Sequence, residues 1–291
     1  MRSLVLGAAG MLGTDLVAEC TRRGWETVGL DLADIDLTVP TQVQKLKDRD
    51  WGSFDWVFNC AAYTAVDKAE EETALAQRLN GIVPGMLASL FADMKWRLVH
   101  ISTDFVFDGG ATRPYREDDP PNPQSSYGRS KLLGEKLVLQ SNPDALVCRT
   151  AWLYGPHGKS FPRTMAAAWS AGKPLRVVAD QTGSPTCTLD LARVLCDLAA
   201  LGPAGGLYHT AGPEEMTWHA FALRSVHTYA LANGLDRPVD IEPITTADWP
   251  TPAKRPAYSV LDTTKVASLG IEAMRPVDAS LADFFTLLGT P

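Results

Sequence analysis

The sequence predicts an α/β protein that contains a doubly wound parallel sheet and a smaller C-terminal α/β lobe. Over about the first two-thirds of the 291 residues, short apolar runs alternate with amphipathic stretches, which is the pattern of βαβ units. The apolar runs are continuous, as expected of strands that are covered on both faces. Beyond Trp152, glycine- and proline-rich segments at residues 155–158 and 243–256 break the alternation, so we expect a separate lobe there.

Each apolar run places one strand, and each amphipathic stretch places one helix. Strands are expected at residues 4–6, 26–31, 55–60, 97–102, 145–150, 175–179 and 206–210. The helices of the sheet domain are expected at residues 11–23, 41–49, 70–94, 126–140 and 188–201, and those of the lobe at residues 161–171, 217–233, 264–269 and 278–288. We expect strands 175–179 and 206–210 to return the chain to the main sheet, which leaves the lobe without a core of its own. The sheet domain then spans residues 1–152 and roughly 174–212, and the lobe spans roughly 153–173 and 213–291.

The composition excludes several classes of protein. The net charge is −7 and no run of Lys or Arg is longer than two residues, so we expect neither nucleic acid nor an anionic membrane as a partner. No apolar stretch reaches the ~18 residues of a membrane-spanning helix. The five cysteines include no Cys-x-x-Cys pair, which is typical of reduced thiols in the cytoplasm. The five histidines lack the spacing of metal ligands, so no protein-built metal site is expected.

A glycine-rich loop of the form G-x-x-G-x-x-G joins the first strand to the first helix. Its residues are Gly7, Gly10, Met11, Leu12 and Gly13. Such a turn lets the backbone approach a pyrophosphate, which the free N–H groups of the helix N-terminus attract. Asp31, at the end of the second strand, is placed to accept hydrogen bonds from the adenosine ribose; the alternative is an exposed turn aspartate, because Asp34 and Asp36 follow. Together these features predict a Rossmann-type site for NAD(P), in preference to a simple tight turn.

A second group of residues carries proton-transfer chemistry. Tyr127 and Lys131 are four residues apart in an expected helix, so they lie one turn apart on one face. An ammonium beside a phenol is expected to lower the phenol pKa, so that the phenol exchanges a proton with a carbonyl oxygen. A hydroxyl from Thr103 or Ser102, at the end of the fourth strand, is expected to share the hydrogen bond to that oxygen. The alternative for Tyr-x-x-x-Lys alone is a solvated helix face.

Six motifs follow one another in a recognisable order. They are residues 59–70 (NCAAYTAVDKAE), 102–109 (STDFVFDG), 127–131 (YGRSK), 149–155 (RTAWLYG), 181–186 (QTGSPT) and 255–261 (RPAYSVL). With them the chain resembles the extended short-chain dehydrogenases/reductases, and among these the dTDP-4-dehydrorhamnose reductase family. The resemblance covers nearly the whole chain.

The resemblance implies a role for each of several residues. Thr103, Tyr127 and Lys131 form the family's catalytic triad. The segment along the cofactor consists of Ala61, Ala62 and Tyr63, with Asn80 near the nicotinamide end. The sugar pocket is implied to consist of Thr64, Val66, Asp104 and Trp152, with Thr103, while Arg255 binds the diphosphate of the sugar nucleotide. From the residues alone, the alternatives are an exposed helix position for Asn80, a surface position for Arg255 and a core position for Trp152.

Three positions depart from the family pattern. Phe105 stands where members commonly have Tyr. Leu32 stands where many relatives have an Arg that would pair with the 2′-phosphate of NADPH. We therefore expect NADH to be favoured, with use of both cofactors, since Arg22 or Arg23 could still reach that phosphate. Some members bind Mg²⁺ between subunits through paired carboxylates near the first helix and after residues 183–185; Asp15 and Asp190 are present here without a fuller acidic cluster, so Mg²⁺ is not expected.

The activity implied by the resemblance is NAD(P)H-dependent reduction of the 4-keto group of a dTDP-6-deoxyhexulose, giving dTDP-L-rhamnose. Alternatives are another nucleotide-sugar reductase, a 4-epimerase with the same triad, and a non-catalytic nucleotide-binding regulatory subunit. A 4,6-dehydratase is disfavoured, because Phe105 stands where that enzyme carries its base. A dTDP-sugar is thus the expected partner, and the sequence is compatible with a homodimer.

Overall fold

A parallel sheet forms the centre of the fold in the computed structural model, which describes residues 1–48 and 51–288. Its six strands in this part of the chain are β1 (Arg2–Leu6), β2 (Glu26–Leu30), β3 (Trp56–Asn59), β4 (Arg97–Thr103), β5 (Leu146–Thr150) and β10 (Gly206–His209). The order is β2-β1-β3-β4-β5-β10, and every neighbouring pair is parallel. From β1 the chain first adds β2 on one side and then β3 on the other, so the strand order reverses between β1 and β3. Doubly wound sheets bind ligands beyond the carboxyl ends of the strands at such a switch point.

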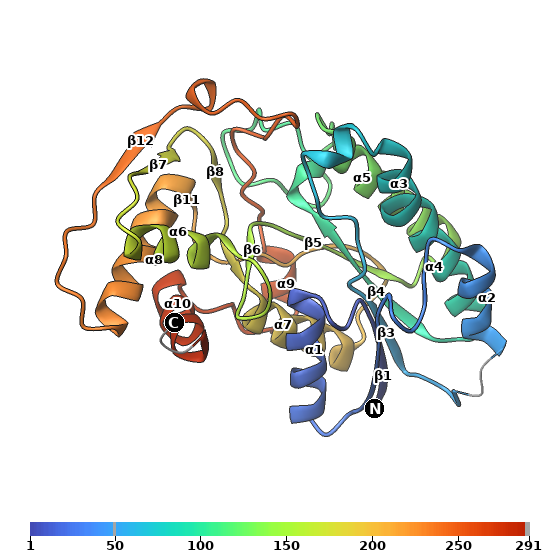
Figure 1. Cartoon of the computed structure of the whole chain (residues 1–291). Helices are drawn as coiled ribbons and strands as arrows, with labels where there is room; N and C mark the ends of the chain where they lie inside the picture. The colour runs from blue at the N-terminus through green and yellow to red at the C-terminus, as the bar shows by residue number, and fades with distance from the viewer. Residues whose placement is uncertain (49–50, 289–291) are drawn as a thin grey trace.

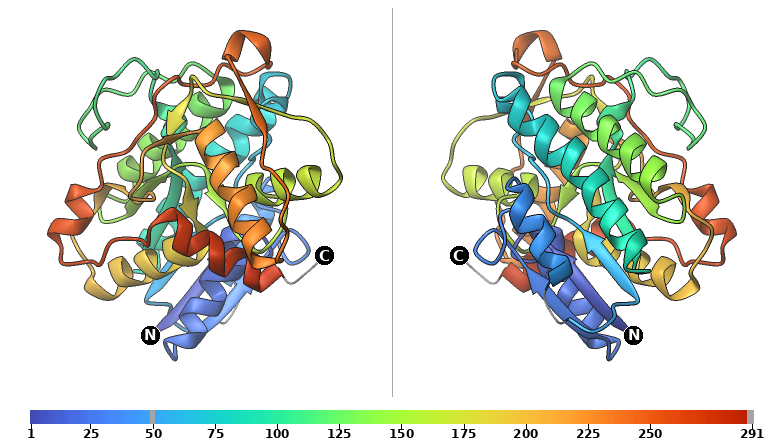
Figure 2. Two further views of the ribbon diagram at one scale, coloured as in Figure 1. Left: turned by 90° about the vertical axis from the view of Figure 1, so that its left-hand side faces the viewer. Right: turned by 90° about the vertical axis from the view of Figure 1, so that its right-hand side faces the viewer.

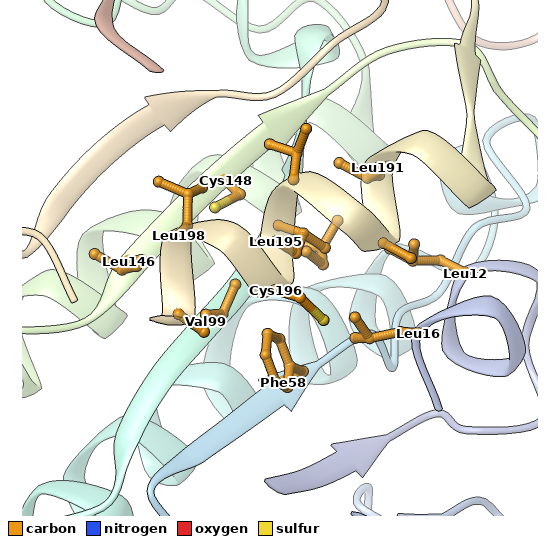
Figure 3. Close-up of a cluster of buried hydrophobic side chains, with 14 of the residues drawn as sticks. Leu12, Leu16, Phe58, Val99, Leu146, Cys148, Leu191, Leu195, Cys196 and Leu198 are labelled. Carbon is orange, nitrogen blue, oxygen red and sulfur yellow. The ribbon is translucent and has the colours of Figure 1, made fainter. Parts of the chain in front are cut away.

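Helices cover both faces of the sheet (Figures 1 and 2). One face carries α1 (Met11–Arg22) and α7 (Thr188–Leu201), and the other carries α2 (Pro40–Asp48), α4 (Val83–Asp93) and α5 (Ser126–Ser141). Alternate residues of β1 enter the two cores: Val5 packs with the α1 and α7 side, and Leu4 and Leu6 pack with the α4 side. Figure 3 shows the first of these cores, in which α7 lies across the strands. Burial on both faces explains the continuous apolar runs of the sequence.

The expected helix 70–94 is divided into four pieces. They are the 3₁₀ turn η1 (Lys68–Glu70), α3 (Thr73–Gln77), the π-helical turn η2 (Arg78–Ile82) and α4. Pro84 lies at the start of α4 and has no N–H, so the carbonyl of Asn80 loses its helical donor four residues later. This explains the local widening at η2. The remaining helices of the sheet domain begin and end within two residues of the expected positions, although Arg49 lies outside the described residues.

The C-terminal lobe is built from three longer helices and pairs of short strands. The helices are α6 (Phe161–Ser170), α8 (Trp218–Ala232) and α10 (Val277–Leu288). Parallel pairs join β7 (Leu175–Val178) to β12 (Ile241–Ile244) and β6 (Leu153–Tyr154) to β9 (Thr186–Cys187); β8 (Thr182–Gly183) and β11 (Met216–Thr217) are antiparallel. The turns η3 (Asp104–Val106) and η4 (Thr246–Asp248) and the short α9 (Thr264–Ser268) complete the elements.

Two expectations for the lobe are wrong. The strand expected at 175–179 does not join the main sheet, because β7 pairs with β12; only the strand expected at 206–210 returns there, as β10. In β7 the buried Leu175 and Val177 alternate with the exposed Arg176, which is the pattern of a strand covered on one face. The lobe also has its own core, in which Tyr154, Phe221 and Phe284 are fully buried. No helix within the described ranges is long and apolar enough to cross a lipid bilayer.

Candidate active site

A cavity of about 870 Å³ opens between the carboxyl ends of the central strands and the lobe. Its size is that of a small-molecule site. Most of the expected site residues line it: Gly7, Gly10, Met11, Leu12, Gly13, Asp31, Ala61, Ala62, Thr64, Val66, Thr103, Asp104, Tyr127, Lys131, Trp152 and Arg255. Tyr63 and Asn80 do not line it. The fold therefore brings the glycine loop, the Thr-Tyr-Lys group and the proposed sugar pocket to one place.

The glycine loop is shaped by close backbone contacts. Gly7 has a φ of +77°, in the left-handed region, and a Cβ there would lie 2.8 Å from the backbone nitrogen of Ala61. A Cβ on Gly13 would lie 2.0 Å from the carbonyl oxygen of Gly7. Glycine at both positions thus lets the start of α1 approach the β1 and β3 ends. No acidic residue stands in the first turn of α1, so its N–H groups remain suited to an anion.

Asp31 lies beside this loop and is not a remote turn residue. Its carboxylate accepts hydrogen bonds from the backbone N–H of Ala9 at 2.8 Å and of Leu32 at 2.7 Å. The side chain of Leu32 is exposed. The expectation that Arg22 or Arg23 reaches toward this position is wrong, because both ion-pair with Glu19 at the far end of α1.

Asn80 is a buried structural link. Its side-chain oxygen accepts from the backbone N–H of Tyr63 at 2.8 Å, and its amide donates to the Tyr63 carbonyl and the Ser130 hydroxyl, each at 3.0 Å. The Tyr63 hydroxyl turns away and donates to Glu72. Asn80 is fully buried, so the exposed-helix alternative is wrong. It holds the segment after β3 against α5, next to the cavity.

The N-terminus of α5 is fixed so that Tyr127 faces the end of β4. The hydroxyl of Ser125 accepts from the backbone N–H of Gly128 at 3.1 Å, as an N-cap. The carboxylate of Glu70 accepts from the backbone N–H of Ser126 at 2.7 Å and from its hydroxyl at 2.9 Å. A negative charge at a helix N-terminus is stabilising. The last residue of the 59–70 motif therefore serves to anchor the helix that carries Tyr127.

Thr103, Asp104 and Tyr127 form the polar end of the cavity. The Thr103 hydroxyl donates to the Asp104 carboxylate at 3.0 Å, and a hydrogen bond links it to Tyr127. Burial raises the pKa of Tyr127 to about 12, the nearby Asp104 charge adds to this, and Thr103 opposes it. Burial likewise raises the pKa of Asp104 to about 6, against the hydrogen bond from Thr103. Tyr127 therefore holds its proton at neutral pH.

Lys131 lies beneath Tyr127 and is buried. Its Nζ donates to the carbonyl oxygen of Ile101 at 2.5 Å. Burial lowers the pKa of Lys131 to about 8, while Glu135 and Cys60 act to raise it. The alternative of a solvated helix face is therefore wrong. The expected lowering of the Tyr127 pKa by Lys131 is also not found, since burial dominates at Tyr127.

Trp152 is half-buried in a strained backbone conformation, with a φ of +46°. Its indole stacks on that of Trp218, with ring centroids 3.6 Å apart and planes within 8°. A Cβ on Gly183 would lie 2.4 Å from the same indole, so the backbone of Gly183 packs against it. One face of Trp152 is thus covered by Trp218, and the two tryptophans line the cavity together.

Arg255 lies at the lobe side of the cavity, and its guanidinium is already paired. It donates to both carboxylate oxygens of Asp67 at 2.8 Å and to the carbonyl of Ala253 at 2.9 Å. The pair joins the 59–70 motif to the 255–261 motif. Arg255 is therefore not a free surface residue, and the Asp67 carboxylate competes with any diphosphate for it.

The residues at the implied Mg²⁺ position do not fit a metal site. Arg275 donates to the carboxylate of Asp190 at 2.8 Å, so a guanidinium already balances that charge. Asp15 accepts a hydrogen bond from Thr188, and His157 lies 3.3 Å from its other oxygen. Within residues 1–48 and 51–288, no group of three or more His, Cys, Asp or Glu side chains is arranged to hold a metal ion.

Sequence reasoning missed three residues of this region. Trp218 and Lys159 line the cavity from the lobe, and Glu135 lies one turn beyond Lys131 in α5. The i, i+4 spacing of Lys131 and Glu135 could have predicted that Glu135 lies on the same face of the helix as Lys131. The sequence carried no signal for Trp218, because its partner Trp152 lies 66 positions earlier and only the lobe fold joins them.

A doubly wound sheet with a glycine loop at its reversal point, and a Thr-Tyr-Lys group in the same cavity, defines a short-chain dehydrogenase/reductase. Within that class, the chain belongs to the RmlD substrate binding domain family, which it matches over residues 1–289.

Relatives cover nearly the whole chain. A probable dTDP-4,6-dihydroxy-2-methyloxan-3-one 4-ketoreductase from Streptomyces antibioticus is 40% identical over 98% of this chain and 95% of its own length. A dTDP-4-dehydrorhamnose reductase from Streptomyces griseus is 40% identical over 99% of this chain and 94% of its own. The crystal structure of a dTDP-4-dehydrorhamnose reductase from Clostridium acetobutylicum is similar with a TM-score of 0.91, at 38% identity over 99% of both chains. One from Bacillus anthracis, in complex with NADP, has a TM-score of 0.90 at 32% identity over 98% of both.

Proposed function

We propose that this chain reduces the 4-keto group of a dTDP-6-deoxyhexulose with NAD(P)H and so produces dTDP-L-rhamnose. The observation that carries the proposal is the placement of Tyr127, with Thr103 and Lys131, in the cavity that also contains the glycine loop. Membership of the RmlD family supports the substrate class. A regulatory subunit that only binds nucleotides has no need for the three residues together.

The proposed chemistry divides between the cofactor and the chain. The dihydronicotinamide supplies a hydride when it is bound. Tyr127 keeps its proton because burial raises its pKa to about 12, and it donates that proton to the sugar oxygen as negative charge develops there. The Thr103 hydroxyl orients Tyr127 and shares the hydrogen bonds to that oxygen. Lys131, fixed by the Ile101 carbonyl, supplies positive charge beneath the reacting oxygen and binds the nicotinamide ribose.

For the cofactor, the glycine loop is proposed to hold the pyrophosphate and Asp31 the adenosine ribose. Among the described residues that line the cavity, the basic side chains are Lys131, Lys159 and Arg255, and the residue directly after Asp31 is the uncharged Leu32. A carboxylate beside the ribose repels a 2′-phosphate. We therefore propose that NADH is favoured and that both cofactors are used; a kcat/KM for NADPH more than ~10-fold above that for NADH would refute the role of Asp31.

A second candidate substrate is favoured by one observation. The Streptomyces antibioticus relative, at 40% identity, is described as a 4-ketoreductase of a different dTDP-sugar. Both reactions reduce a 4-keto group, so Tyr127 would serve as the acid in either, and the part of the cavity lined by Trp152 and Trp218 would receive the sugar ring in which they differ.

We place the protein in the cytoplasm, since all five cysteines are free thiols, and we propose that it works as a homodimer.

The experiment that tests the proposal is cofactor oxidation by the purified chain with dTDP-4-dehydrorhamnose and with dTDP-4-keto-6-deoxyglucose in parallel. We expect stoichiometric oxidation of NADH and a product with the rhamno configuration by NMR. Interconversion of sugars without net cofactor oxidation would show an epimerase. Cofactor binding without turnover of either ketosugar would show a binding subunit.

A further inference from the structure

Three consecutive turns of α5 face three consecutive residues at the end of β4. Tyr127, Lys131 and Glu135 are spaced i, i+4 and i+8, so they form one row along the helix. Lys131 donates to the Ile101 carbonyl at 2.5 Å, and the Ser102 hydroxyl donates to the Glu135 carboxylate at 2.5 Å. Thr103, the last residue of β4, lies near Tyr127. Two hydrogen bonds therefore join the helix to the strand end behind Tyr127.

Glu135 is the innermost member of this row, and it is held from several sides. Its side chain is 2% exposed. Arg149, in β5, donates to both carboxylate oxygens, at 2.8 Å and 2.7 Å, and it is 1% exposed. A buried ion pair of this kind adds little net stability over a well-packed apolar pair, because both charges lose their hydration. Its position behind Lys131 therefore calls for an explanation other than stability.

We propose that Glu135 is a positioning residue, which uses its bonds to Ser102 and Arg149 to hold the end of β4 against α5 and to keep Lys131 charged beneath Tyr127. The proposal rests on the function proposed above. It assigns to the Glu135–Arg149 pair, neither member of which lines the cavity, the task of orienting the row of Tyr127 and Lys131.

The charges around Lys131 support this assignment. Glu135 lies on its own helix, Cys60 follows β3, and His100 lies in β4. Burial and the Lys131 charge lower the pKa of His100 far below its usual value, so that imidazole is neutral. Burial also raises the pKa of Cys60 to about 12, so that thiol is neutral at pH 7. Glu135 is then the neighbouring carboxyl group that acts to raise the Lys131 pKa, and its replacement by Gln is expected to lower that pKa from about 8.

The test uses three variants and two controls. Glu135→Gln removes the charge and keeps the shape, and the double variant Glu135→Leu with Arg149→Met removes both charges without leaving an arginine unpaired. Ser102→Ala removes only the bond to the strand. Controls are Glu19→Gln, a glutamate that accepts from two arginines on α1, and Ser225→Ala, a buried serine in α8.

The main readout is the pKa of the Lys131 amine, measured by NMR of ¹³C-labelled lysine side chains, with Lys131→Arg to assign the signal. We expect this pKa to fall by at least about 1 in Glu135→Gln, and by less in the double variant, because loss of the Arg149 cation acts in the opposite direction. Ser102→Ala and both controls should keep the wild-type value. The alkaline limb of the kcat profile should move to lower pH by the same amount. Ser102→Ala should lower kcat at least about threefold while the dinucleotide Kd is unchanged.

The outcomes separate this inference from the proposed function. An unchanged Lys131 pKa in folded Glu135→Gln would overturn the electrostatic role, and a wild-type kcat in Ser102→Ala would overturn the role in holding β4. If Glu135→Gln fails to fold, the double variant is compared with Arg149→Met, from which it differs only at Glu135, and an unchanged Lys131 pKa between these two would overturn the electrostatic role. If the wild type reduces neither ketosugar, the proposed function fails, while the NMR measurement still decides the role of Glu135.

Discussion

Asp104 places a carboxylate in the cavity wall at a cost in stability that is set by pH. Burial raises its pKa from 3.8 to about 6. The folded state therefore binds the proton on Asp104 more tightly than the unfolded state does. The stability that this protonation contributes is fully present below pH 3.8 and is lost as the pH rises through 6, where the buried carboxyl group becomes ionised. A difference of about 2 in pKa corresponds to about 3 kcal/mol above pH 7 and to about 1 kcal/mol near pH 4.5.

Asp104→Asn removes this titration and keeps an oxygen that accepts from Thr103. We expect the free energy of unfolding of the variant, relative to wild type, to rise by about 2 kcal/mol between pH 4.5 and pH 7.5. Urea unfolding followed by circular dichroism across that range measures the difference, and the pH trend cancels constant packing effects. The expected loss of substrate affinity is measured separately.

Asp108, four residues later, is the matched control. Hydrogen bonds from the backbone of Gly110 and from Asn122 hold the pKa of Asp108 below its usual value. The linkage of Asp108 is therefore nearly complete below pH 4.5, and Asp108→Asn should give an almost constant difference from wild type between pH 4.5 and pH 7.5. If the difference for Asp104→Asn were the same at every pH, or if Asp108→Asn showed the same rise, the assignment of a buried, destabilised carboxylate at Asp104 would be refuted.

Three further predictions concern the cavity. Tyr127→Phe should lower kcat at least ~100-fold while the dinucleotide Kd stays unchanged, as stopped-flow kinetics and a binding titration will show; a rate above a tenth of wild type would require another acid. Arg255→Ala should raise the KM for the dTDP-sugar at least about tenfold and leave the KM for the dinucleotide unchanged. Asp67→Asn frees the Arg255 guanidinium, so it should not raise the KM for the dTDP-sugar. Equal effects of Arg255→Ala on both ligands would remove Arg255 from the substrate site. Trp218→Ala and Trp152→Ala should each weaken sugar-nucleotide binding by calorimetry, with a coupling of about 1 kcal/mol in the double variant; additive effects would mean that the stack does not shape the site.

Several features of the fold could be predicted because they depend on local sequence. The continuous apolar runs identified the central strands, and residues 206–210 were expected to return to the sheet, as β10 does. The glycine loop was predictable because its spacing is local: Gly13 is required by the carbonyl of Gly7, six residues earlier, although the contact that requires Gly7 comes from the distant Ala61. The pair at 127 and 131 was predictable because helical spacing alone brings two side chains to one face.

Other features depend on contacts between distant segments. Whether β7 joins the central sheet or pairs with β12 depends on a strand that lies some 65 residues later in the chain. The residues at 175–179 alone do not show which of the two strands will be the partner. The same holds for the lobe core and for the stack of Trp152 on Trp218.

The sequence by itself determined the parallel sheet, the dinucleotide loop and the row of Tyr127 and Lys131, since each arises from spacing within one element or one turn. Only the tertiary structure decided how those groups behave. Burial raises the pKa of Tyr127 to about 12 and lowers that of Lys131 to about 8, and Asp67 takes the guanidinium of Arg255. Desolvation and the choice of a charge partner depend on everything that surrounds a group, and those surroundings come from segments far apart in the chain.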